Sequence, residues 1–233
     1  MENVKIKICD IRDAKTAEYC EKKGVSFLGI HQIKYPLSQE KKEMFQAIRS
    51  NTDKIKLVLV TQEEDIEKLL EMCLECDWDY IQLHFKISPE EIIKIKDYLK
   101  DNSSNAGIIS VVDISNVEDY NVDMLAEVSD FLLFDSSIRG GTGKTSSIEA
   151  LKRIPQIAKN NKFFIAGGLN SDNVTDIISI CKPYAVDVQS GVEFSIPELK
   201  HKKDPKRITA FVKAVEVYNK QISLDKDMDD NYR

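Results

Sequence analysis

The chain has 233 residues, of which 42% are hydrophobic and 31% charged, and its formal net charge is −6. This composition is typical of a globular protein with a substantial core, and it offers no basic patch for nucleic acid or for a membrane surface. The charged amino terminus lacks the apolar core of a signal peptide, and no apolar run approaches the roughly 18 residues of a membrane span. We therefore expect a cytoplasmic protein whose partner is a small molecule.

Short runs rich in β-branched and aromatic residues predict eight strands, and segments with helical spacing predict a helix after each of them. The predicted strands are 4–9, 25–31, 55–61, 80–85, 107–113, 131–135, 163–167 and 185–189. The predicted helices are 14–23, 39–50, 63–76, 89–100, 122–128, 147–160, 173–181 and 205–221.

The alternation of strands and helices indicates the fold class. Strand runs that are apolar nearly throughout are typical of a parallel sheet covered on both faces. Eight strand–helix units in about 220 residues favour a closed (β/α)₈ barrel over an open doubly wound sheet, which usually has five or six strands. Because no linker rich in Pro, Gly or Ser divides the chain, we expect one domain, 1–222, and a disordered acidic tail, 223–233.

The carboxyl ends of the strands are the place to look for chemistry, because the loops there form the active site of such barrels. This rule limits the candidate site residues to the polar residues and glycines at the carboxyl ends of the predicted strands. The candidates are Cys9 with Asp10, His31, His84, Asp113, Asp135, Gly167 with Gly168, and Ser190 with Gly191.

Asp135 ends an apolar strand and is followed at once by a glycine-rich loop, 136–145. A carboxyl group at a strand end beside exposed backbone N–H groups can supply a proton and a phosphate cradle. The alternative is that Asp135 caps a turn. Gly143-Lys144-Thr145 does not complete a nucleotide-binding P-loop, because Ile138 stands where its first glycine is required.

Glycines at three neighbouring strand ends predict a phosphate site, which this fold commonly places after its seventh and eighth strands. Backbone N–H groups can approach phosphate oxygens where no side chain intervenes, and a serine hydroxyl can add a donor. The alternative is that the glycines only allow tight turns. The predicted phosphate-binding residues are Gly141, Gly143, Gly167, Gly168, Ser190 and Gly191.

Cys9 and Asp135 would face each other across the barrel mouth if both side chains point inward. A thiolate can then act as a general base and a protonated carboxyl group as a general acid. The alternative for Cys9 is an inert core cysteine. The Cys73–Cys76 pair lies in a helical pattern without nearby histidines, so we interpret it as core packing and expect no metal site.

Several short motifs, in one order along the chain, resemble those of the phosphoribosylanthranilate isomerase family. They are Lys5-Ile-Lys-Ile-Cys9, Phe27-Leu-Gly29, Ile81-Gln-Leu-His84, Leu133-Phe-Asp-Ser136, Gly140-Gly-Thr-Gly-Lys-Thr145, Ala166-Gly-Gly-Leu-Asn170, Val186-Asp-Val-Gln-Ser-Gly-Val-Glu193 and Lys203-Asp-Pro205. The order of these motifs is far more specific than any one of them.

The resemblance implies a (β/α)₈ barrel that converts N-(5′-phosphoribosyl)anthranilate to its 1-deoxyribulose form by an Amadori rearrangement without a cofactor. It implies that Cys9 removes the C2′ proton and that Asp135 protonates the ribose ring oxygen. His84 and Asp187 match positions that imply contact with the substrate. The sequence does not decide between a monomer and a homodimer.

Three departures from the family pattern concern the substrate. The family's glycine after the cysteine is Asp10, a charge that we expect to disfavour the thiolate, and Phe85 replaces a glycine after His84. The arginine that holds the anthranilate carboxylate has no clear counterpart, and Lys34 is the nearest candidate. Two alternatives therefore stay open beside the isomerase, namely an isomerase for another phosphosugar amine and a non-catalytic phosphosugar- or partner-binding barrel.

Overall fold

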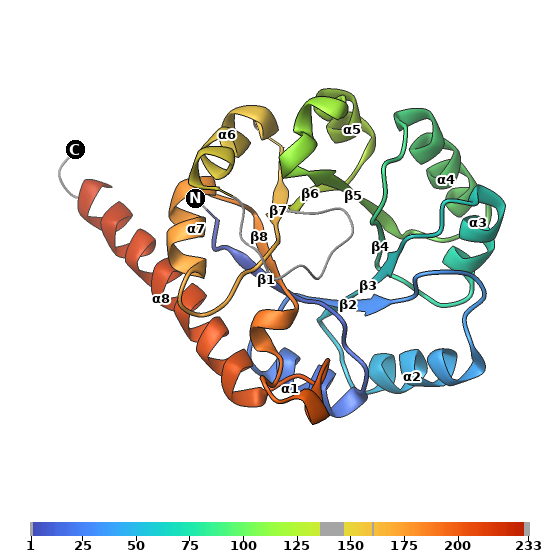
Figure 1. The fold of residues 1–233 in the computed structure, drawn as a ribbon, viewed down its shortest axis with the longest axis horizontal. Coiled ribbons are helices and arrows are strands. Elements are labelled where there is room, and N and C mark those ends of the chain that lie inside the picture. Colours follow the sequence, from blue (N-terminus) through green and yellow to red (C-terminus); the bar gives the residue numbers. More distant parts are fainter. Residues whose placement is uncertain (1, 136–146, 160, 231–233) are drawn as a thin grey trace.

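The computed structural model describes residues 2–135, 147–159 and 161–230 and shows a closed barrel of eight parallel strands surrounded by helices (Figure 1). Neighbouring strands pair in sequence order, and β1 closes the barrel against β8. The strands are β1 Lys5–Ile8, β2 Phe27–His31, β3 Lys56–Thr61, β4 Tyr80–Leu83, β5 Gly107–Asp113, β6 Phe131–Asp135, β7 Phe163–Ile165 and β8 Ala185–Val188. The predicted (β/α)₈ fold is confirmed.

The helices lie outside the barrel, as Figure 1 shows. They are α1 Ala14–Lys22, α2 Gln39–Ser50, α3 Ile66–Leu74, α4 Pro89–Asp101, α5 Val122–Val128, α6 Ile148–Ala158, α7 Val174–Cys181 and α8 Pro205–Asp230, with short 3₁₀ helices η1 Ile114–Asp119, η2 Ser190–Val192 and η3 Pro197–Leu199. α8 extends past its predicted end at Gln221. In the described part of the chain, each helix is too short or too polar to cross a membrane.

Local signals set several helix starts. Ser88 forms a capping box with Glu91, and Pro89 occupies the first turn of α4. Asn173 stands at the start of α7 but makes no side-chain cap. Its Oδ1 accepts from the Asn170 N–H at 2.9 Å and its Nδ2 donates to the Gly168 carbonyl at 3.0 Å. Asn173 therefore orders the loop between β7 and α7.

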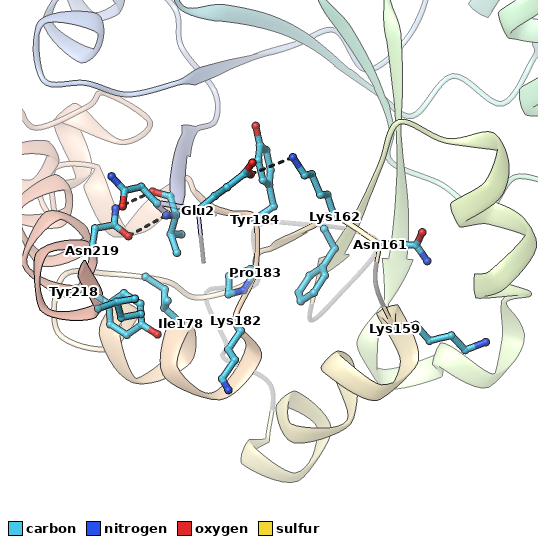
Figure 2. A pocket seen from close by; sticks show the side chains of 14 residues that line it. Glu2, Lys159, Asn161, Lys162, Ile178, Lys182, Pro183, Tyr184, Tyr218 and Asn219 are labelled. Atoms are coloured by element: carbon cyan, nitrogen blue, oxygen red, sulfur yellow. Dashed lines mark hydrogen bonds and ion pairs between the residues drawn. The ribbon is translucent and has the colours of Figure 1, made fainter. Parts of the chain in front are cut away.

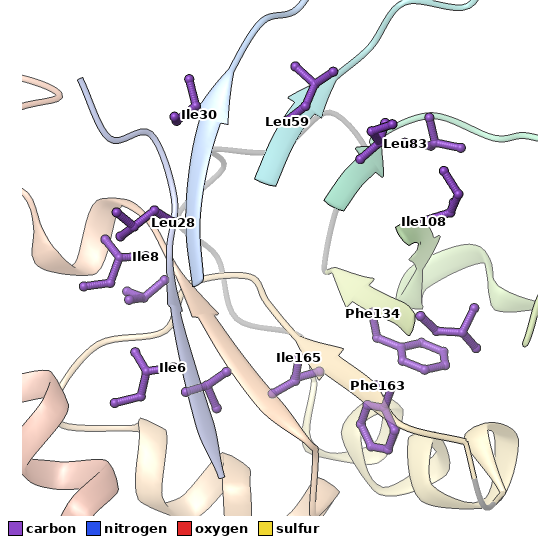
Figure 3. Close-up of a cluster of buried hydrophobic side chains, with 14 of the residues drawn as sticks. Ile6, Ile8, Leu28, Ile30, Leu59, Leu83, Ile108, Phe134, Phe163 and Ile165 are labelled. Carbon is purple, nitrogen blue, oxygen red and sulfur yellow. The ribbon is translucent and has the colours of Figure 1, made fainter. Parts of the chain in front are cut away.

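Alternate residues of each strand point to opposite faces of the barrel wall. One set packs against the helices and forms the outer core, and Figure 3 shows members such as Ile8, Ile30 and Phe134. Phe85 belongs to this outer core, so its bulk does not enter the barrel mouth. The other set fills the barrel interior.

The interior is divided along the barrel axis into an aromatic half and a polar half. Five rings lie at the amino ends of the strands, with centroids 5.1–6.4 Å apart, and they are Phe27, Tyr80, Phe131, Phe164 and Tyr184. The carboxyl ends instead carry charged and polar side chains. The fold thus closes one end of the barrel and concentrates its chemistry at the other.

Candidate active site

Among the described residues, seven polar side chains from five strands or their carboxyl ends line the polar half of the barrel. The two predicted catalytic residues are among them, with Cys9 5% and Asp135 8% exposed. β1 and β6 lie three strands apart around the closed barrel, so Cys9 and Asp135 approach the mouth from different sides. The group consists of Lys7, Cys9, His31, Gln82, His84, Asp135 and Asp187.

Cys9 is surrounded by groups that control its proton. The Lys7 ammonium donates to Sγ at 3.5 Å, and Nε2 of His31 lies 3.2 Å from Sγ. The space for the sulfur exists because residue 29 is glycine, since a Cβ there would lie 2.6 Å from Sγ. Burial raises the pKa of the Cys9 thiol to about 11, against the opposing effect of Lys7. The isolated thiol is therefore protonated at neutral pH.

Lys7 is fully buried, and its ammonium forms an ion pair with Asp187 at 2.6 Å. Burial alone would lower the pKa of Lys7, but the charges of Asp187 and Cys9 outweigh it and raise the pKa above its ordinary value. Sequence reasoning found Asp187 but missed Lys7. The available signal was a lysine inside an apolar strand, two residues before Cys9 and hence on the same face.

Asp10 is also buried, and its carboxylate is held by Arg12 through hydrogen bonds of 2.9 Å from Nε and 2.8 Å from Nη2. Burial would raise the pKa of Asp10, but Arg12 and the charge of His31 lower it. Its backbone has φ 61°, so β1 ends here and the side chain leaves the strand alternation. Arg12 was missed by the sequence reasoning.

The expectation that Asp10 disfavours the Cys9 thiolate is not supported by this geometry. The carboxylate faces Nδ1 of His31 at 3.9 Å, while Cys9 is on the Nε2 side of the same ring. The acidic group that raises the pKa of Cys9 is Asp187. Burial lowers the pKa of His31 to about 4, so the ring is neutral at neutral pH.

His84 connects β4 with β6. Its Nδ1 lies 3.1 Å from Nε2 of Gln82, and its Nε2 lies 4.0 Å from Oδ2 of Asp135. The Nδ1 edge of the ring thus faces the Gln82 side-chain amide, and the Nε2 edge faces Asp135. The structure therefore brings His84 beside the predicted acid.

Lys34 is the predicted site residue that the structure does not bring to this group. Its ammonium donates to the Gln62 carbonyl at 2.7 Å and lies 3.5 Å from Glu63, on the loop after β3, and its side chain is 58% exposed. Arg12 pairs with Asp10, and Lys41 donates to the His31 carbonyl, so both cations lie on the Cys9 side of the mouth.

The loops after β7 and β8 pack against each other. Gly167 and Gly168 have φ values of 95° and 66°, which end β7 two residues before its predicted end. A Cβ on Gly191 would lie 1.9 Å from the Leu169 carbonyl oxygen, so glycine is required where Ser190 and Gly191 meet the β7 loop. Gly141 and Gly143, also predicted to bind phosphate, lie outside the described residues.

One group in the described ranges has the donor types of a metal site. Ligand atoms of Asp10, Glu193 and His201 all lie within 4.8 Å of one another. However, Arg12 already binds Asp10, and Lys203 binds Glu193 at 3.0 Å. Since each carboxylate has a cation of its own, we interpret the group as an ion-pair cluster.

A cavity of about 260 Å³ lies at the opposite end of the barrel, between the amino ends of β1, β7 and β8 and α8. Figure 2 shows Lys162 paired with Glu2. The side chain of Asn219 accepts from the Val4 N–H and donates to the Val4 carbonyl. These contacts tie the segment before β1 to β7 and to α8. In this fold the amino-end face serves stability, so we do not place chemistry there.

Comparison with known proteins identifies relatives with this architecture. The model of the N-(5′-phosphoribosyl)anthranilate (PRA) isomerase family matches residues 6–214. The N-(5′-phosphoribosyl)anthranilate isomerase of Aquifex aeolicus is 34% identical over 221 residues, which are 90% of this chain and 97% of that protein.

Solved structures agree. The phosphoribosyl anthranilate isomerase of Thermotoga maritima has a TM-score of 0.71 and 28% identity, covering 91% of this chain and 98% of the other. A phosphoribosyl anthranilate isomerase in complex with reduced 1-(o-carboxyphenylamino)-1-deoxyribulose 5-phosphate has a TM-score of 0.69 and 26% identity, with the same coverage. With the family match spanning most of the chain, this protein belongs to the N-(5′-phosphoribosyl)anthranilate isomerase family.

Proposed function

We propose that this chain isomerises N-(5′-phosphoribosyl)anthranilate to its 1-deoxyribulose form in tryptophan biosynthesis, as a cofactor-independent intramolecular oxidoreductase. The observation that carries the catalytic assignment is the placement of Cys9 and Asp135. Both are buried at carboxyl ends of strands and approach the mouth from different sides. The reaction needs a proton donor at the ring oxygen and a base at C2′, and these two side chains can supply them.

Ring opening is the first step. Asp135 in its protonated form donates to the ribose ring oxygen, the C1′–O bond breaks, and the nitrogen lone pair forms a C1′=N iminium. We assign His84 to the same part of the sugar, because its Nε2 lies 4.0 Å from Asp135. In the second step the Cys9 thiolate removes the C2′ proton, which the adjacent iminium acidifies. The resulting enolamine then tautomerises to the ketone.

Lys7 supports the second step. Its ammonium lies 3.5 Å from Sγ and favours the thiolate, while Asp187 holds the ammonium in place. Asp187 thus contributes to the pocket through Lys7 as well as by facing the substrate. Because Lys7 and Asp187 come from paired positions on β1 and β8, the barrel wall itself fixes their geometry.

For the phosphate group we propose the paired loops after β7 and β8. Gly167, Gly168 and Gly191 allow close backbone approach, Ser190 offers a hydroxyl, and Asn173 orders the loop. Gly141 and Gly143 stay predicted members of this site. A related isomerase is solved with a phosphorylated 1-deoxyribulose ligand, which is consistent with such a cradle.

For the anthranilate carboxylate we propose Lys34. The exposed Lys34–Glu63 pair is worth at most about 1 kcal/mol, so an incoming carboxylate can replace Glu63 at small cost.

Complementation of a tryptophan auxotroph lacking this isomerase tests the function. We expect growth with the wild-type gene and none with Cys9→Ser or Asp135→Asn, with soluble protein in each strain. Absence of growth with soluble wild-type protein would contradict anthranilate as the substrate moiety. Turnover of other phosphoribosyl amines that Asp135→Asn abolishes would then favour the paralogous isomerase, and phosphate-ligand binding without turnover would favour a binding protein.

A further inference from the structure

The side chain of His31 lies between the proposed base and a buried carboxylate. β1 and β2 are neighbours, with Ile8 opposite Leu28, so Cys9 and His31 come from adjacent strand ends. Nε2 of His31 is 3.2 Å from Sγ, and Nδ1 is 3.9 Å from Oδ1 of Asp10. A thiol, an imidazole and a carboxylate therefore lie side by side in the order Cys9, His31, Asp10.

The carboxylate of Asp10 and the backbone of His31 are both held by neighbouring cations. Arg12 donates one hydrogen bond to each carboxylate oxygen of Asp10. Lys41 donates to the His31 carbonyl, which fixes the backbone that carries the ring. An ionised Asp10 on the Nδ1 side favours the tautomer with its proton on Nδ1. The lone pair of Nε2 then faces the Cys9 thiol.

We propose that His31 is a positioning residue that accepts the proton of the Cys9 thiol, and that Asp10, held by Arg12, orients the ring and stabilises its charged form. His31 acts through Cys9 and does not itself touch the C2′ proton. In the motif that this chain otherwise resembles, the residue after the cysteine is glycine. Asp10 therefore adds a carboxylate to a site that would otherwise hold a single thiol base, and Cys9, His31 and Asp10 together form a proton relay.

Each charge of the relay is costly alone, because the site is buried. Burial raises the pKa of Cys9 and lowers that of His31, so neither a lone thiolate nor a lone imidazolium is stable there. Transfer of the proton from Sγ to Nε2 creates both charges side by side, and their attraction offsets part of the desolvation cost. The negative Asp10 and the positive Lys7 stabilise the imidazolium and the thiolate, respectively.

The protons balance over one turnover. The S–H bond of Cys9 breaks and an N–H bond forms on His31; the thiolate then takes the C2′ proton and becomes a thiol again. Asp135 has meanwhile lost one proton to the ring oxygen. The proton gained by His31 equals the one lost by Asp135, and exchange through solvent restores both groups.

Alkylation of Cys9 by iodoacetamide, followed by mass spectrometry of its peptide, tests the relay in the full chain, because the thiolate is the reactive form. We expect His31→Gln to slow alkylation at neutral pH by about 10²-fold. Asp10→Asn should slow it less, and should add nothing in the His31→Gln background, because Asp10 acts through His31. Imidazole in solution should restore the rate in His31→Ala, which a merely structural role of the ring would not produce.

Lys68→Ala is the control, since this exposed lysine of α3 pairs with Asp65 and should leave the rate unchanged. The pH profile of alkylation must be compared in the same variants. The titratable and charged groups around His31 are Lys7 in β1, Cys9 and Asp10 just after β1, His84 just after β4, Lys41 in α2, and Lys203 in the loop before α8. Circular dichroism verifies that each variant is folded.

A wild-type alkylation rate in folded His31→Gln would overturn the relay and leave Lys7 as the group that ionises Cys9. If Asp10→Asn slows the alkylation of Cys9 equally in the wild-type and the His31→Gln backgrounds, the proposed role of Asp10 is overturned. This inference rests on the proposed role of Cys9, but the alkylation assay needs no substrate. If the protein lacks isomerase activity while His31→Gln still slows alkylation, the relay stands and the proposed function falls. If His31→Gln changes neither the isomerase activity nor the alkylation rate, only the relay is overturned.

Discussion

Single side chains decide the chemistry of the barrel mouth, and Gly29 shows how. The position opposite Cys9 carries no side chain, and the thiol occupies the freed space. Because Gly29 provides the space for the Cys9 thiol, a substitution there should affect activity more than folding.

We expect Gly29→Ala to lower kcat by about 100-fold, because a new Cβ 2.6 Å from Sγ displaces the thiol from its reacting position. Rotation of the Cys9 side chain relieves the contact with sulfur, whereas contacts of 3.2 Å with Cα of Cys9 and Cγ2 of Val60 remain and should cost some thermal stability. Steady-state kinetics and a melting curve check both expectations. An active variant would show that the thiol position tolerates displacement and would speak against Cys9 as the base.

Lys34→Ala should raise KM for N-(5′-phosphoribosyl)anthranilate about tenfold with little change in kcat, which corresponds to the loss of one charge-assisted hydrogen bond. The control is Lys68→Ala, since Lys68 is a similarly exposed lysine paired with Asp65. Steady-state kinetics measure both. An unchanged KM would place the carboxylate on another cation of the mouth, with Arg12 and Lys41 as the next variants.

His31 should make the folded protein sensitive to acid. Its pKa is lowered by burial to about 4 in the folded state, whereas the unfolded chain has the ordinary value of 6.5. Between these values the unfolded state binds the extra proton, so stability falls by about 1.4 kcal/mol per pH unit on acidification, at most roughly 3 kcal/mol in all. Above pH 6.5 the contribution is constant. Urea unfolding across this range should show a shallower slope in His31→Gln, and parallel slopes would contradict the assignment.

At the scale of elements, the amino end of the barrel contributes to stability, whereas the carboxyl end carries the polar site. The loop between α2 and β3 lies at the amino end, and Glu21 at the end of α1 holds it. One carboxylate oxygen accepts the N–H groups of Asp53, Lys54 and Ile55 at 2.8, 2.7 and 3.0 Å. This contact ties two helix–strand units together far from the polar half of the interior.

Glu21→Ala should therefore destabilise the fold by about 1–3 kcal/mol, because three backbone donors lose a charged acceptor. The activity of the folded variant should equal that of the wild type, since the amino-end face of such barrels serves stability. Glu18→Ala is the control on the same helix, where an exposed pair with Lys22 is lost. Urea unfolding and kcat/KM measure the two effects, and a reduced kcat/KM would link the two barrel ends.

At the scale of the whole molecule, the Lys7–Asp187 pair bridges the strands that close the barrel. The two residues are direct partners in the β1–β8 register, and their ion pair is almost completely shielded from solvent. Removal of one partner leaves a buried charge, which is far more costly than removal of both.

We expect Lys7→Met to destabilise the protein by about 3–5 kcal/mol and the double variant Lys7→Met with Asp187→Leu to recover most of this loss. Urea unfolding of both variants and the wild type measures the difference. A single variant as stable as the wild type would mean that solvent reaches Asp187 and that the pair does not hold the barrel closed.

Much of this molecule follows from the sequence alone. Strand and helix periodicity are local properties, so eight strands and the helices between them are found within a few residues of their predicted places. The position of Cys9, His84 and Asp135 at strand ends follows from the same local patterns, whereas their burial at the barrel mouth is visible only in the structure. The end of β7 was predicted too late, because Gly167 and Gly168 turn the backbone before the apolar pattern stops.

Only the tertiary structure decided which charges meet. Lys7 and Asp187 are 180 residues apart, and their contact depends on the register with which the last strand closes on the first. Asp10 leaves the strand alternation through a left-handed backbone, so no periodicity could predict that it faces His31 and not Cys9. Lys34 is drawn to Glu63 by a loop conformation that the sequence does not specify. Local patterns fix what each residue can do, whereas its partners are set by packing between segments distant in the chain.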